Sequence, residues 1–369
     1  MRIVFFVSSM QGGGAERIAA FLCNHWSAKG HEVSLIPTFS GRGKCNYSLD
    51  ENVHIEYLAD RIGSTRKSPG NKLRRFLELR KIIKERDADV VISFLTDVNV
   101  AVLLASRGLS VPLVVSERIY PPAMPLHWMW KVLRLITYPW ARAVVMQTED
   151  GVKWLQHWCP KATPKLIPNP VIYPLPKNEP QICPEECIPE GKKLLIGAGR
   201  LEEQKGFDIL LQAFASLQEN HSDWVLVILG EGRQREVLEQ EIDALGLCKS
   251  VYLPGRVGNL SDWYKLGGIY VMSSRFEGFP NVLLEAMTHQ LPIVSFDCKT
   301  GPRDIIREDK NGILVPPEQG ALGLASAINS LMVDEEKRLS MGKTASEVLT
   351  RFSRARIAAL WDELLEVSG

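Results

Sequence analysis

The chain has 369 residues, a length that accommodates about two domains of ~100–200 residues each. Its hydrophobic fraction of 45% and its charged fraction of 24% are ordinary for a globular protein. Because the formal net charge is only +1, nothing draws the whole chain to nucleic acid, and any basic site must be local. We therefore expect no nucleic-acid partner.

Cysteine usage and hydropathy predict a cytoplasmic protein with reduced thiols. The seven cysteines are odd in number and follow no disulfide framework, and Cys183 and Cys187 lack the partners of a zinc site. The apolar run Ile3–Val7 is too short for a signal peptide and leads into Gly12–Gly14, so it predicts a first strand instead. No segment reaches the ~18 uninterrupted apolar residues of a membrane-spanning helix.

The first half of the chain alternates strand and helix patterns, which predicts a parallel, doubly wound sheet. The runs that fit strands are 2–8, 32–37, 53–57, 89–94, 112–116 and 142–147. Gly12–Gly14 end the first run and open a helix at Ala15. The spacing is not that of a dinucleotide-binding loop, and the later ribose carboxylate is absent. By themselves these glycines fit a plain strand-to-helix turn as well as a ligand contact.

Two helical stretches of the first half have a pattern typical of membrane surfaces. Residues 72–86 combine an apolar stripe with seven cations, namely Lys72, Arg74, Arg75, Arg80, Lys81, Lys84 and Arg86. Residues 127–140 carry three tryptophans and two cations. Basic amphipathic helices bind anionic membranes, and tryptophan favours the membrane interface. Each stretch by itself also fits a core helix with a solvated face.

The second half repeats the alternation after a proline-rich segment. Residues 168–190 carry seven prolines, which predicts an interdomain linker. The following strand patterns are 193–198, 224–229, 250–253, 269–272, 292–296 and 313–315. The tail from Ile357 to Leu365 reads as an amphipathic helix.

The loop that follows strand 193–198 is a candidate anion site. The strand ends in Gly197 and Gly199, and Arg200, Lys205 and Gly206 follow before the next helix. Ligands of open α/β sheets bind beyond the carboxyl ends of the strands. A guanidinium fork and an ammonium point charge together suit a diphosphate. The alternative is ordinary solvated charge on a βα loop.

A second candidate site lies between Glu277 and Glu285. Pro280 suits the first turn of a helix, so the backbone N–H groups of Asn281 and Val282 are expected at a helix N-terminus, which attracts anions. The two carboxylates accept hydrogen bonds from hydroxyl groups. A phosphate cradle between two hydroxyl acceptors is suited to a nucleotide-sugar. A core helix with two surface glutamates is the alternative.

These segments resemble the retaining glycosyltransferases of family four, and the resemblance covers nearly the whole chain. It is carried by Gly-Gly-Gly-Ala-Glu-Arg at 12–17, Pro-Asn-Pro at 168–170, Gly-Arg-Leu-x-x-x-Lys-Gly at 199–206, Leu-Gly-Glu-Gly at 229–232, Pro-Gly-Arg-Val at 254–257 and the pair Glu277 and Glu285. The implied fold is α/β of the GT-B type, in which two Rossmann-like, doubly wound parallel-sheet domains face each other across a cleft. The acceptor domain would span 1–168, the linker 169–190 and the donor domain 191–354, with a C-terminal helix at 355–369 packed back on the acceptor domain.

The resemblance also implies roles for individual residues. Arg200 and Lys205 would bind the donor diphosphate and act in catalysis, Glu277 would contact the transferred sugar, and Glu285 the ribose. Further donor-binding residues would be Gly14, Arg256, Val257, Phe279, Pro280, Asn281 and Val282. The donor would be a UDP-sugar without any other cofactor, and the anomeric configuration would be retained. Taking the chain to have no Asp-x-Asp motif and no clustered His or Cys ligands, we expect no metal, the cations stabilising the leaving group instead.

Within the family, the first half is similar to N-acetylgalactosaminyltransferases that extend lipid-diphosphate-linked oligosaccharides. The residues that carry this similarity are Ile-Ser-Phe-Leu-Thr-Asp-Val-Asn at 92–99, Ser-Glu-Arg at 116–118 and Ile-Thr-Tyr-Pro at 136–139. The implied acceptor is a polyprenyl-diphosphate-linked saccharide, and N-acetylgalactosamine is the favoured sugar among N-acetylhexosamines and hexoses. We therefore expect the protein to be peripheral on the inner face of the cell membrane. Its contacts there would be Arg74, Arg75, Arg80 and Lys81.

The acceptor side departs from the family pattern. Family members often carry a His on the loop that corresponds to 116–118, where this chain has Ser-Glu-Arg. Arg118 cannot act as a base, since its pKa is too high. We therefore predict Glu117 as the catalytic residue on the acceptor side, and Asp97, Asn99 and Arg118 as further acceptor-binding residues. Alternative functions are a GT-B nucleotide-sugar epimerase, a non-enzymatic nucleotide-binding protein and a soluble polysaccharide synthase.

Overall fold

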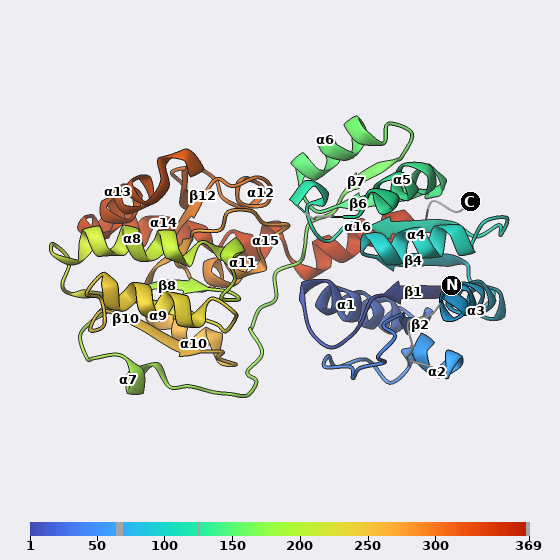
Figure 1. Cartoon of the computed structure of the whole chain (residues 1–369), viewed down its shortest axis with the longest axis horizontal. Coiled ribbons are helices and arrows are strands. Elements are labelled where there is room, and N and C mark those ends of the chain that lie inside the picture. The colour runs from blue at the N-terminus through green and yellow to red at the C-terminus, as the bar shows by residue number, and fades with distance from the viewer. Residues whose placement is uncertain (64–68, 124–125, 367–369) are drawn as a thin grey trace. The chain divides into compact units, whose positions relative to one another are not determined.

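The computed structural model divides the chain into two compact α/β units, each with its own parallel sheet (Figure 1). It describes residues 1–63, 69–123 and 126–366. Unit 1 comprises Met1–Asn169 together with the chain from Ala355 onward, and unit 2 comprises Pro170–Arg354. The predicted α/β fold class with two doubly wound parallel sheets is confirmed.

Among the described residues, unit 1 has a seven-stranded sheet in the order β3-β2-β1-β4-β5-β6-β7. Its strands are β1 (Arg2–Val7), β2 (Glu32–Pro37), β3 (His54–Ile55), β4 (Val90–Phe94), β5 (Leu113–Ser116), β6 (Ala143–Met146) and β7 (Pro164–Leu166). Its helices are α1 (Gly14–Ala28), α2 (Leu58–Ile62), α3 (Pro69–Glu85), α4 (Thr96–Ala105), η1 (Pro121–Ala123), α5 (Trp128–Thr137), η2 (Tyr138–Trp140), α6 (Glu149–Trp158) and α16 (Arg354–Glu366). Six of the strands overlap the predicted runs. The seventh, β7, is only three residues long and gives no apolar run to detect.

Helices cover both faces of this sheet, which is why its strands are apolar throughout. All five residues of β4 are buried. One face packs against α1 and α16, and the other packs against α2, α3, α4 and α6. The outer sides of α3, α4 and α5 therefore lie on one side of unit 1, because α4 contacts both of the other helices.

The C-terminal helix α16 is anchored on α1 of unit 1. Trp361 is fully buried against Trp26, and their ring centroids lie 6.4 Å apart. Asp362 accepts hydrogen bonds from Trp26 Nε1 at 2.9 Å, Lys29 Nζ at 2.7 Å and His25 Nε2 at 3.0 Å. Burial by itself would raise the pKa of Asp362, but the hydrogen bonds from Lys29, His25 and Trp26 outweigh it and lower the pKa below its ordinary value.

Unit 2 has a six-stranded sheet among its residues, in the order β10-β9-β8-β11-β12-β13. Its strands are β8 (Lys193–Ala198), β9 (Trp224–Leu229), β10 (Val251–Gly255), β11 (Gly267–Met272), β12 (Ile293–Phe296) and β13 (Gly312–Val315). Its helices are α7 (Pro184–Cys187), η3 (Glu203–Lys205), α8 (Phe207–Gln218), α9 (Arg235–Ala244), α10 (Leu260–Leu266), α11 (Asn281–Met287), α12 (Pro302–Ile305), η4 (Pro317–Gln319), α13 (Gly320–Val333), α14 (Glu335–Ala345) and α15 (Val348–Arg351). Strands β8 and β9 match the predicted ranges residue for residue, and the others differ by one to two residues at their ends.

The proline-rich segment 169–190, predicted as an interdomain linker, is attached to unit 2 over most of its length. Val171 and Leu175 are buried in the core of unit 2, and Ile182 and Ile188 pack against that core. The backbone also joins the unit, since the Val171 N–H donates to the Phe352 carbonyl at 2.7 Å. Apolar residues between the prolines therefore attach most of this segment to unit 2.

Candidate active site

In unit 2, three loops meet at the carboxyl ends of β8, β9 and β11. Gly206, at φ 64°, closes the loop after β8, and a Cβ there would lie 2.1 Å from the Ser273 carbonyl oxygen. Gly230, at φ 147°, follows β9, and a Cβ there would lie 1.8 Å from the Gly199 carbonyl oxygen. Both positions therefore require glycine, because any side chain would separate the loops. This close contact brings Lys205 to Glu277 across 72 residues of sequence.

Lys205 and Glu277 form a buried ion pair at the centre of these loops. Lys205 Nζ lies 2.6 Å from Glu277 Oε1, and the two side chains are 14% and 8% exposed. Ser274 Oγ donates to the same oxygen at 2.7 Å. Among the described residues no donor reaches Glu277 Oε2. The carboxylate is therefore fixed through one oxygen while the other remains available to accept a hydrogen bond from a ligand hydroxyl.

Glu285 lies in the same region, in the middle of α11. It is 5% exposed and is engaged within the protein. Burial, and then the charges of Glu285 and Glu277, raise the pKa of the Tyr270 hydroxyl, so both carboxylates lie near the end of β11. Burial, followed by the charge of Glu277, likewise raises the pKa of the Cys298 thiol to about 12, which keeps that thiol protonated and inert.

Two residues that support this site were not singled out from the sequence. Ser274 Oγ donates a 2.7 Å hydrogen bond to Glu277 Oε1 and so fixes that carboxylate. Arg275 forms a bidentate pair with Asp208 of α8, at 2.9 and 2.6 Å, and donates to the Glu203 carbonyl at 2.7 Å. It thereby ties the loop after β11 to the loop after β8. In the sequence, the only indication of these roles is that Ser274 and Arg275 lie close to Glu277.

Of the remaining predicted donor-binding residues, some are exposed to solvent and others are buried. Arg200 and Arg256 are exposed on the loops after β8 and β10, and Arg200 has no ion-pair partner among the described residues. Val257 and Phe279 are buried in the core, where the Phe279 ring packs 5.8 Å from Phe352. Their side chains therefore contribute packing, and only their backbone groups are offered to a ligand.

The predicted helix after Pro280 is present but short. Helix α11 has seven residues, Asn281–Met287, and Pro280 precedes it at the N-cap position rather than inside the first turn. Pro280 is buried, whereas Asn281 and Val282 are half-buried. A helix of two turns has a weak dipole, so the cations of the loop after β8 are the stronger anion-binding groups here.

In unit 1, the glycine loop after β1 is held by Tyr47. The Tyr47 hydroxyl accepts from the Gly13 N–H at 2.8 Å and donates to the Gly13 carbonyl at 2.7 Å. Gly13 has φ 136°, and Gly14 begins α1, one residue earlier than predicted. Glu16 of the same helix is buried and accepts from Ser9 Oγ at 3.1 Å. Sequence analysis gave no signal for Tyr47, because it lies 34 residues away from Gly13.

The predicted acceptor-side catalytic residue Glu117 is a structural residue in this fold. It is 3% exposed, and its carboxylate accepts from Thr96 Oγ1 at 2.8 and 2.9 Å, from Tyr138 at 2.5 Å and from Arg134 at 3.4 Å. Burial and the adjacent Glu117 charge raise the pKa of Tyr138, which keeps its hydroxyl as a donor. With these donors around it, Glu117 joins β5 to α4 and α5 and is not presented to a substrate.

Asn99 also requires a correction, whereas the acceptor-binding role of Asp97 stays a prediction. Asn99 is fully buried, accepts from Ser93 Oγ at 2.8 Å, and donates to the Ser116 carbonyl at 2.9 Å. Its amide is thus used inside unit 1. Asp97 lies in the first turn of α4 and is exposed beyond the end of β4.

Arg118 is buried among neutral partners. It is 8% exposed, hydrogen-bonds Asn169 Oδ1, and its guanidinium carbon lies 4.6 Å from the centre of the Phe94 ring. Its Nε has no hydrogen-bond partner among the described residues. Burial lowers the pKa of Arg118 to about 9. The residue lies beyond β5 as predicted, but most of its guanidinium is enclosed.

Helix α3 presents only part of its predicted cationic face. Arg74 and Lys81 are exposed, although Lys81 lies 3.6 Å from Glu85. Arg75 is half-buried, and burial lowers its pKa. Arg80 donates to the Ala105 and Arg107 carbonyls, at 2.7 Å each, so it attaches α3 to the end of α4. The expectation that Arg80 contacts a membrane is therefore wrong.

No group of three or more His, Cys, Asp or Glu with metal-binding geometry occurs in residues 1–63, 69–123 and 126–366. The metal-free expectation also assumed that the chain has no Asp-x-Asp sequence, which is wrong, because Asp87-Ala88-Asp89 is one. In the structure both carboxylates pair with Arg2 at the start of β1. They lie at the amino ends of β1 and β4, whereas the unit 1 loops described above follow the carboxyl ends of the strands.

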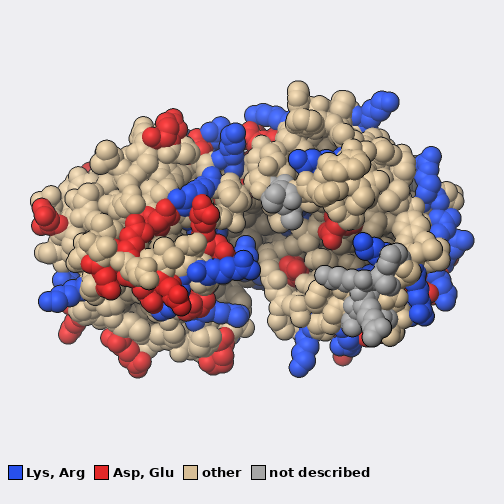
Figure 2. All heavy atoms as spheres, viewed as in Figure 1, with Lys and Arg blue, Asp and Glu red and all other residues tan. Residues whose placement is uncertain are grey.

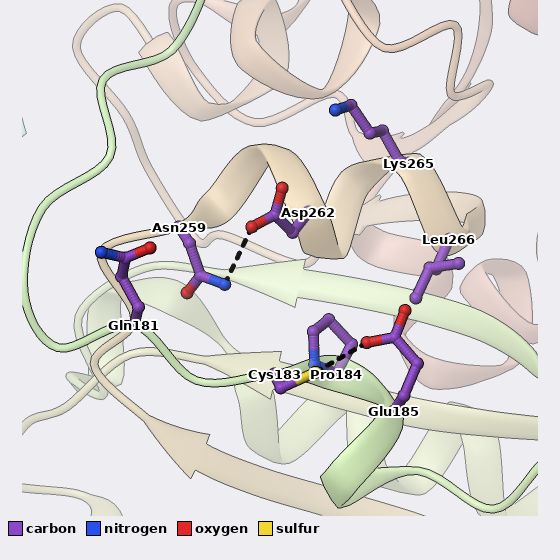
Figure 3. A pocket seen from close by; sticks show the side chains of 8 residues that line it. All are labelled: Gln181, Cys183, Pro184, Glu185, Asn259, Asp262, Lys265 and Leu266. Atoms are coloured by element: carbon purple, nitrogen blue, oxygen red, sulfur yellow. Dashed lines mark hydrogen bonds between the residues drawn. The ribbon is translucent and has the colours of Figure 1, made fainter.

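Unit 2 also has a separate pocket of about 420 Å³ between the proline-rich segment and α10 (Figure 3). It is lined by Gln181, Cys183, Pro184, Glu185, Asn259, Asp262, Lys265 and Leu266. Several of its polar groups bond to one another, as Asn259 does to Asp262 at 3.1 Å and Cys183 to Glu185 at 3.0 Å. None of the predicted donor residues lines this pocket, so it is distinct from the predicted donor site.

Comparison with known families agrees with this arrangement. Residues 12–172 match the model described as Glycosyltransferase Family 4, and residues 179–348 match the model described as Glycosyl transferases group 1. The chain belongs to the family 4 and group 1 glycosyltransferases. This glycosyltransferase is 28% identical over 367 residues to a Campylobacter jejuni alpha-1,4-N-acetyl-D-galactosaminyltransferase acting on GalNAc-alpha-(1->4)-GalNAc-alpha-(1->3)-diNAcBac-PP-undecaprenol, with 99% of this chain and 98% of that protein covered.

A second Campylobacter jejuni relative, an N-acetylgalactosamine-N,N'-diacetylbacillosaminyl-diphospho-undecaprenol 4-alpha-N-acetylgalactosaminyltransferase, is 27% identical, and the match covers 97% of both chains. Among solved structures, Anabaena HepE in complex with UDP superposes with a TM-score of 0.83 at 19% identity over 99% of both chains. Sucrose-phosphate synthase from Thermosynechococcus elongatus also gives 0.83, at 18% identity, covering 99% of this chain and 98% of that one. These structures confirm that the glycosyltransferase has the GT-B fold.

Proposed function

We propose that this glycosyltransferase moves a sugar, with N-acetylgalactosamine favoured, from a UDP-sugar to a lipid-diphosphate-linked saccharide, with retention of the anomeric configuration and without a metal ion. The single observation that carries the proposal is the Lys205–Glu277 pair, which places a cation and a free carboxylate oxygen together. Such a pair can contact a diphosphate and a sugar hydroxyl side by side.

In the proposed reaction, the bond between the sugar and the diphosphate breaks and negative charge develops on the leaving UDP. Lys205 and the exposed Arg200 supply positive charge to it in a partly buried site, where electrostatic stabilisation is strong. Lys205 Nζ has three N–H groups, and only part of this capacity is used by Glu277. Glu277 Oε2 would accept from a hydroxyl of the transferred sugar. Glu285, one turn inside α11, would accept from the ribose.

The acceptor hydroxyl is proposed to attack from the face that the diphosphate leaves, as the retaining mechanism requires. With Glu117 enclosed by its own hydrogen bonds, unit 1 offers no free general base at that position. The departing diphosphate oxygen is then the group that takes the acceptor proton. This assignment is consistent with an arginine, rather than a base, at position 118.

The lipid-linked acceptor is supported by two Campylobacter jejuni relatives, whose names specify undecaprenol-linked saccharides. No helix within the described ranges is long and apolar enough to cross a membrane. Contact with the bilayer would then be peripheral. On unit 1, Lys and Arg side chains gather over α3 (Figure 2), and Leu73 and Leu77 of α3 are 61% and 54% exposed. Exposed cations beside apolar side chains suit an anionic membrane surface.

The test is a transfer assay with radiolabelled UDP-N-acetylgalactosamine and a panel of polyprenyl-diphosphate-linked saccharides. Label that enters the organic phase only when an acceptor is present supports the proposal, and product NMR gives the anomeric configuration. Conversion of the free nucleotide-sugar without acceptor would instead identify an epimerase. Labelled water-soluble polymer would identify a soluble polysaccharide synthase.

A further inference from the structure

Helix α5 of unit 1 has its apolar side turned outward. Five large apolar residues of this ten-residue helix are exposed, by 43–68%: Trp128, Met129, Val132, Leu135 and Ile136. The fully enclosed residues of the helix are instead Arg134, 6% exposed, and Thr137, 0% exposed. At about 100° per residue, the five exposed side chains occupy one continuous arc of roughly 120°.

The inward side of α5 places Arg134 and Thr137 against a buried carboxylate, and Trp130 and Leu133 pack against the core beside them. Arg134 Nη1 lies 3.4 Å from Glu117 Oε1, and its guanidinium carbon lies 4.6 Å from the centre of the Trp154 ring of α6. Thr137 Oγ1 donates to the Leu133 carbonyl at 2.8 Å. The orientation of α5 is thus fixed by a buried ion pair, and the outward apolar side cannot turn into the core without breaking that pair.

The end of α6 lies beside helix α5 and adds one more exposed apolar residue. Cys159 Sγ lies 3.7 Å from the Leu135 carbonyl oxygen, so the end of α6 adjoins the last turn of α5. Trp158, just before Cys159, is 58% exposed. We call the set Trp128, Met129, Val132, Leu135, Ile136 and Trp158 the α5 face. Contiguous apolar surface of this kind on a protein marks an interaction site.

The charges at its margin indicate which partner covers the α5 face. Helix α5 contains no Asp or Glu, and Lys131 is exposed beside the arc. Beyond α6, Lys161 and Lys165 are exposed on a stretch that also has no acidic residue. Cations around an apolar centre complement anionic lipid headgroups, and tryptophans such as Trp128 and Trp158 favour the depth where headgroups meet acyl chains.

We propose that the α5 face docks unit 1 onto a lipid bilayer, with its apolar side chains in the headgroup region and the lysines at the lipid phosphates. This inference rests on the proposed lipid-linked acceptor, and it assigns apolar insertion to α5 in addition to the charge contact of α3. Helices α5 and α3 would then differ in how their membrane binding depends on salt. Binding through α5 persists at high salt, whereas binding through the cations of α3 weakens.

The test compares the Val132→Ser/Ile136→Ser variant of the full chain with wild type on vesicles of equal parts phosphatidylethanolamine and phosphatidylglycerol. We expect about a tenfold loss of vesicle-bound protein at high salt, since two inserted aliphatic side chains are removed. Transfer to the full-length polyprenyl acceptor should fall, whereas transfer to a short-chain, water-soluble analogue should hold. The matched control is Leu322→Ser/Leu339→Ser in unit 2, which removes two apolar residues that are 80% and 63% exposed. This control should bind vesicles as wild type does.

Three outcomes overturn the inference. One is a Val132→Ser/Ile136→Ser variant that binds vesicles as wild type does. A second is a wild-type dimer in sedimentation that this variant converts to a monomer, which would make the α5 face a contact between two copies. A third is equal slowing on both acceptors. Inactivity of the wild type on every acceptor, with vesicle binding still dependent on the α5 face, would contradict the proposed function and leave the docking surface supported.

Discussion

Replacing Lys205 by Met tests the centre of the site, because Met keeps the aliphatic stem and removes only the charge. The stem packs near Gly199, where a Cβ would lie 3.0 Å from the Lys205 Cε. After the substitution, Glu277 keeps Ser274 as a donor but loses its counter-ion in a position that is 8% exposed. We expect both stability and turnover to fall.

The loss of stability and the loss of turnover differ in size, and a second substitution should reverse only the first. Breaking a buried ion pair from one side costs about 3 kcal/mol or more, and for a unit of this size that lowers Tm by roughly 6–12 °C. Loss of a group that stabilises the leaving diphosphate lowers kcat by about 10²–10³-fold. Adding Glu277→Gln removes the stranded charge, so the double variant should regain much of the Tm. Its turnover should stay low.

The measurement is differential scanning calorimetry together with a transfer assay, made on the two single variants and the double variant. Lys193→Met is the matched control, because Lys193 lies 3.1 Å from Asp223 in an exposed pair worth at most about 1 kcal/mol. A Lys205→Met variant with wild-type Tm and turnover within about threefold would refute the reasoning. So would a double variant that is no more stable than Lys205→Met.

Glu285→Gln should weaken UDP binding, whereas Glu277→Gln should leave UDP affinity nearly unchanged and depress transfer, and calorimetric titration with UDP distinguishes them. The reverse pattern would exchange the two roles. EDTA should leave the rate unchanged, and a loss restored by Mg²⁺ or Mn²⁺ would contradict a metal-free reaction. Asp362→Asn should destabilise unit 1 by about 1.5 kcal/mol at neutral pH. The α1 hydrogen bonds lower the pKa of Asp362 against the opposing effect of burial, so its contribution is present above pH ~3.9 and is lost as pH falls through the folded-state pKa. In thermal melts of both forms the difference in Tm should therefore shrink as pH falls below ~3.9, and a difference that stays constant down to about pH 2 would exclude the mechanism. Lys72→Ser/Arg74→Ser in α3 should weaken vesicle binding at low salt and not at high salt, and vesicle sedimentation would expose a salt-independent loss as contrary evidence.

The sequence by itself determined the sheets and the chemistry of the unit 2 loops. Strands such as β8 and β9 lie between two helical layers, so they appear as uninterrupted apolar runs with sharp ends. The residues after those ends must lie at one edge of a parallel sheet. This is why Arg200, Lys205 and Glu277 could be placed near one another before any contact was known. Glycines such as Gly206 mark the loops at the same edge of the sheet.

Only the tertiary structure decided which polar residues are available to a ligand. Glu117 and Asn99 follow strand ends just as Arg200 does, yet they are enclosed by partners from α4, η2 and β5. Likewise, Arg80 has the sequence signature of a surface cation but is bonded to the carbonyls at the end of α4. The periodicity of apolar and polar residues indicates which of them share a face of a helix, but it does not indicate which residues pack against that face.

Helix α5 shows this most clearly. The sequence of 127–140 fits either a membrane-surface helix or a core helix, and the apolar stripe of a helix usually faces the core. The structure places the stripe outward, because Arg134 on the opposite side of the helix is drawn to Glu117, buried at the end of β5. That pairing joins residues 17 positions apart through a buried contact, so it depends on how β5 and α5 pack and not on any local pattern.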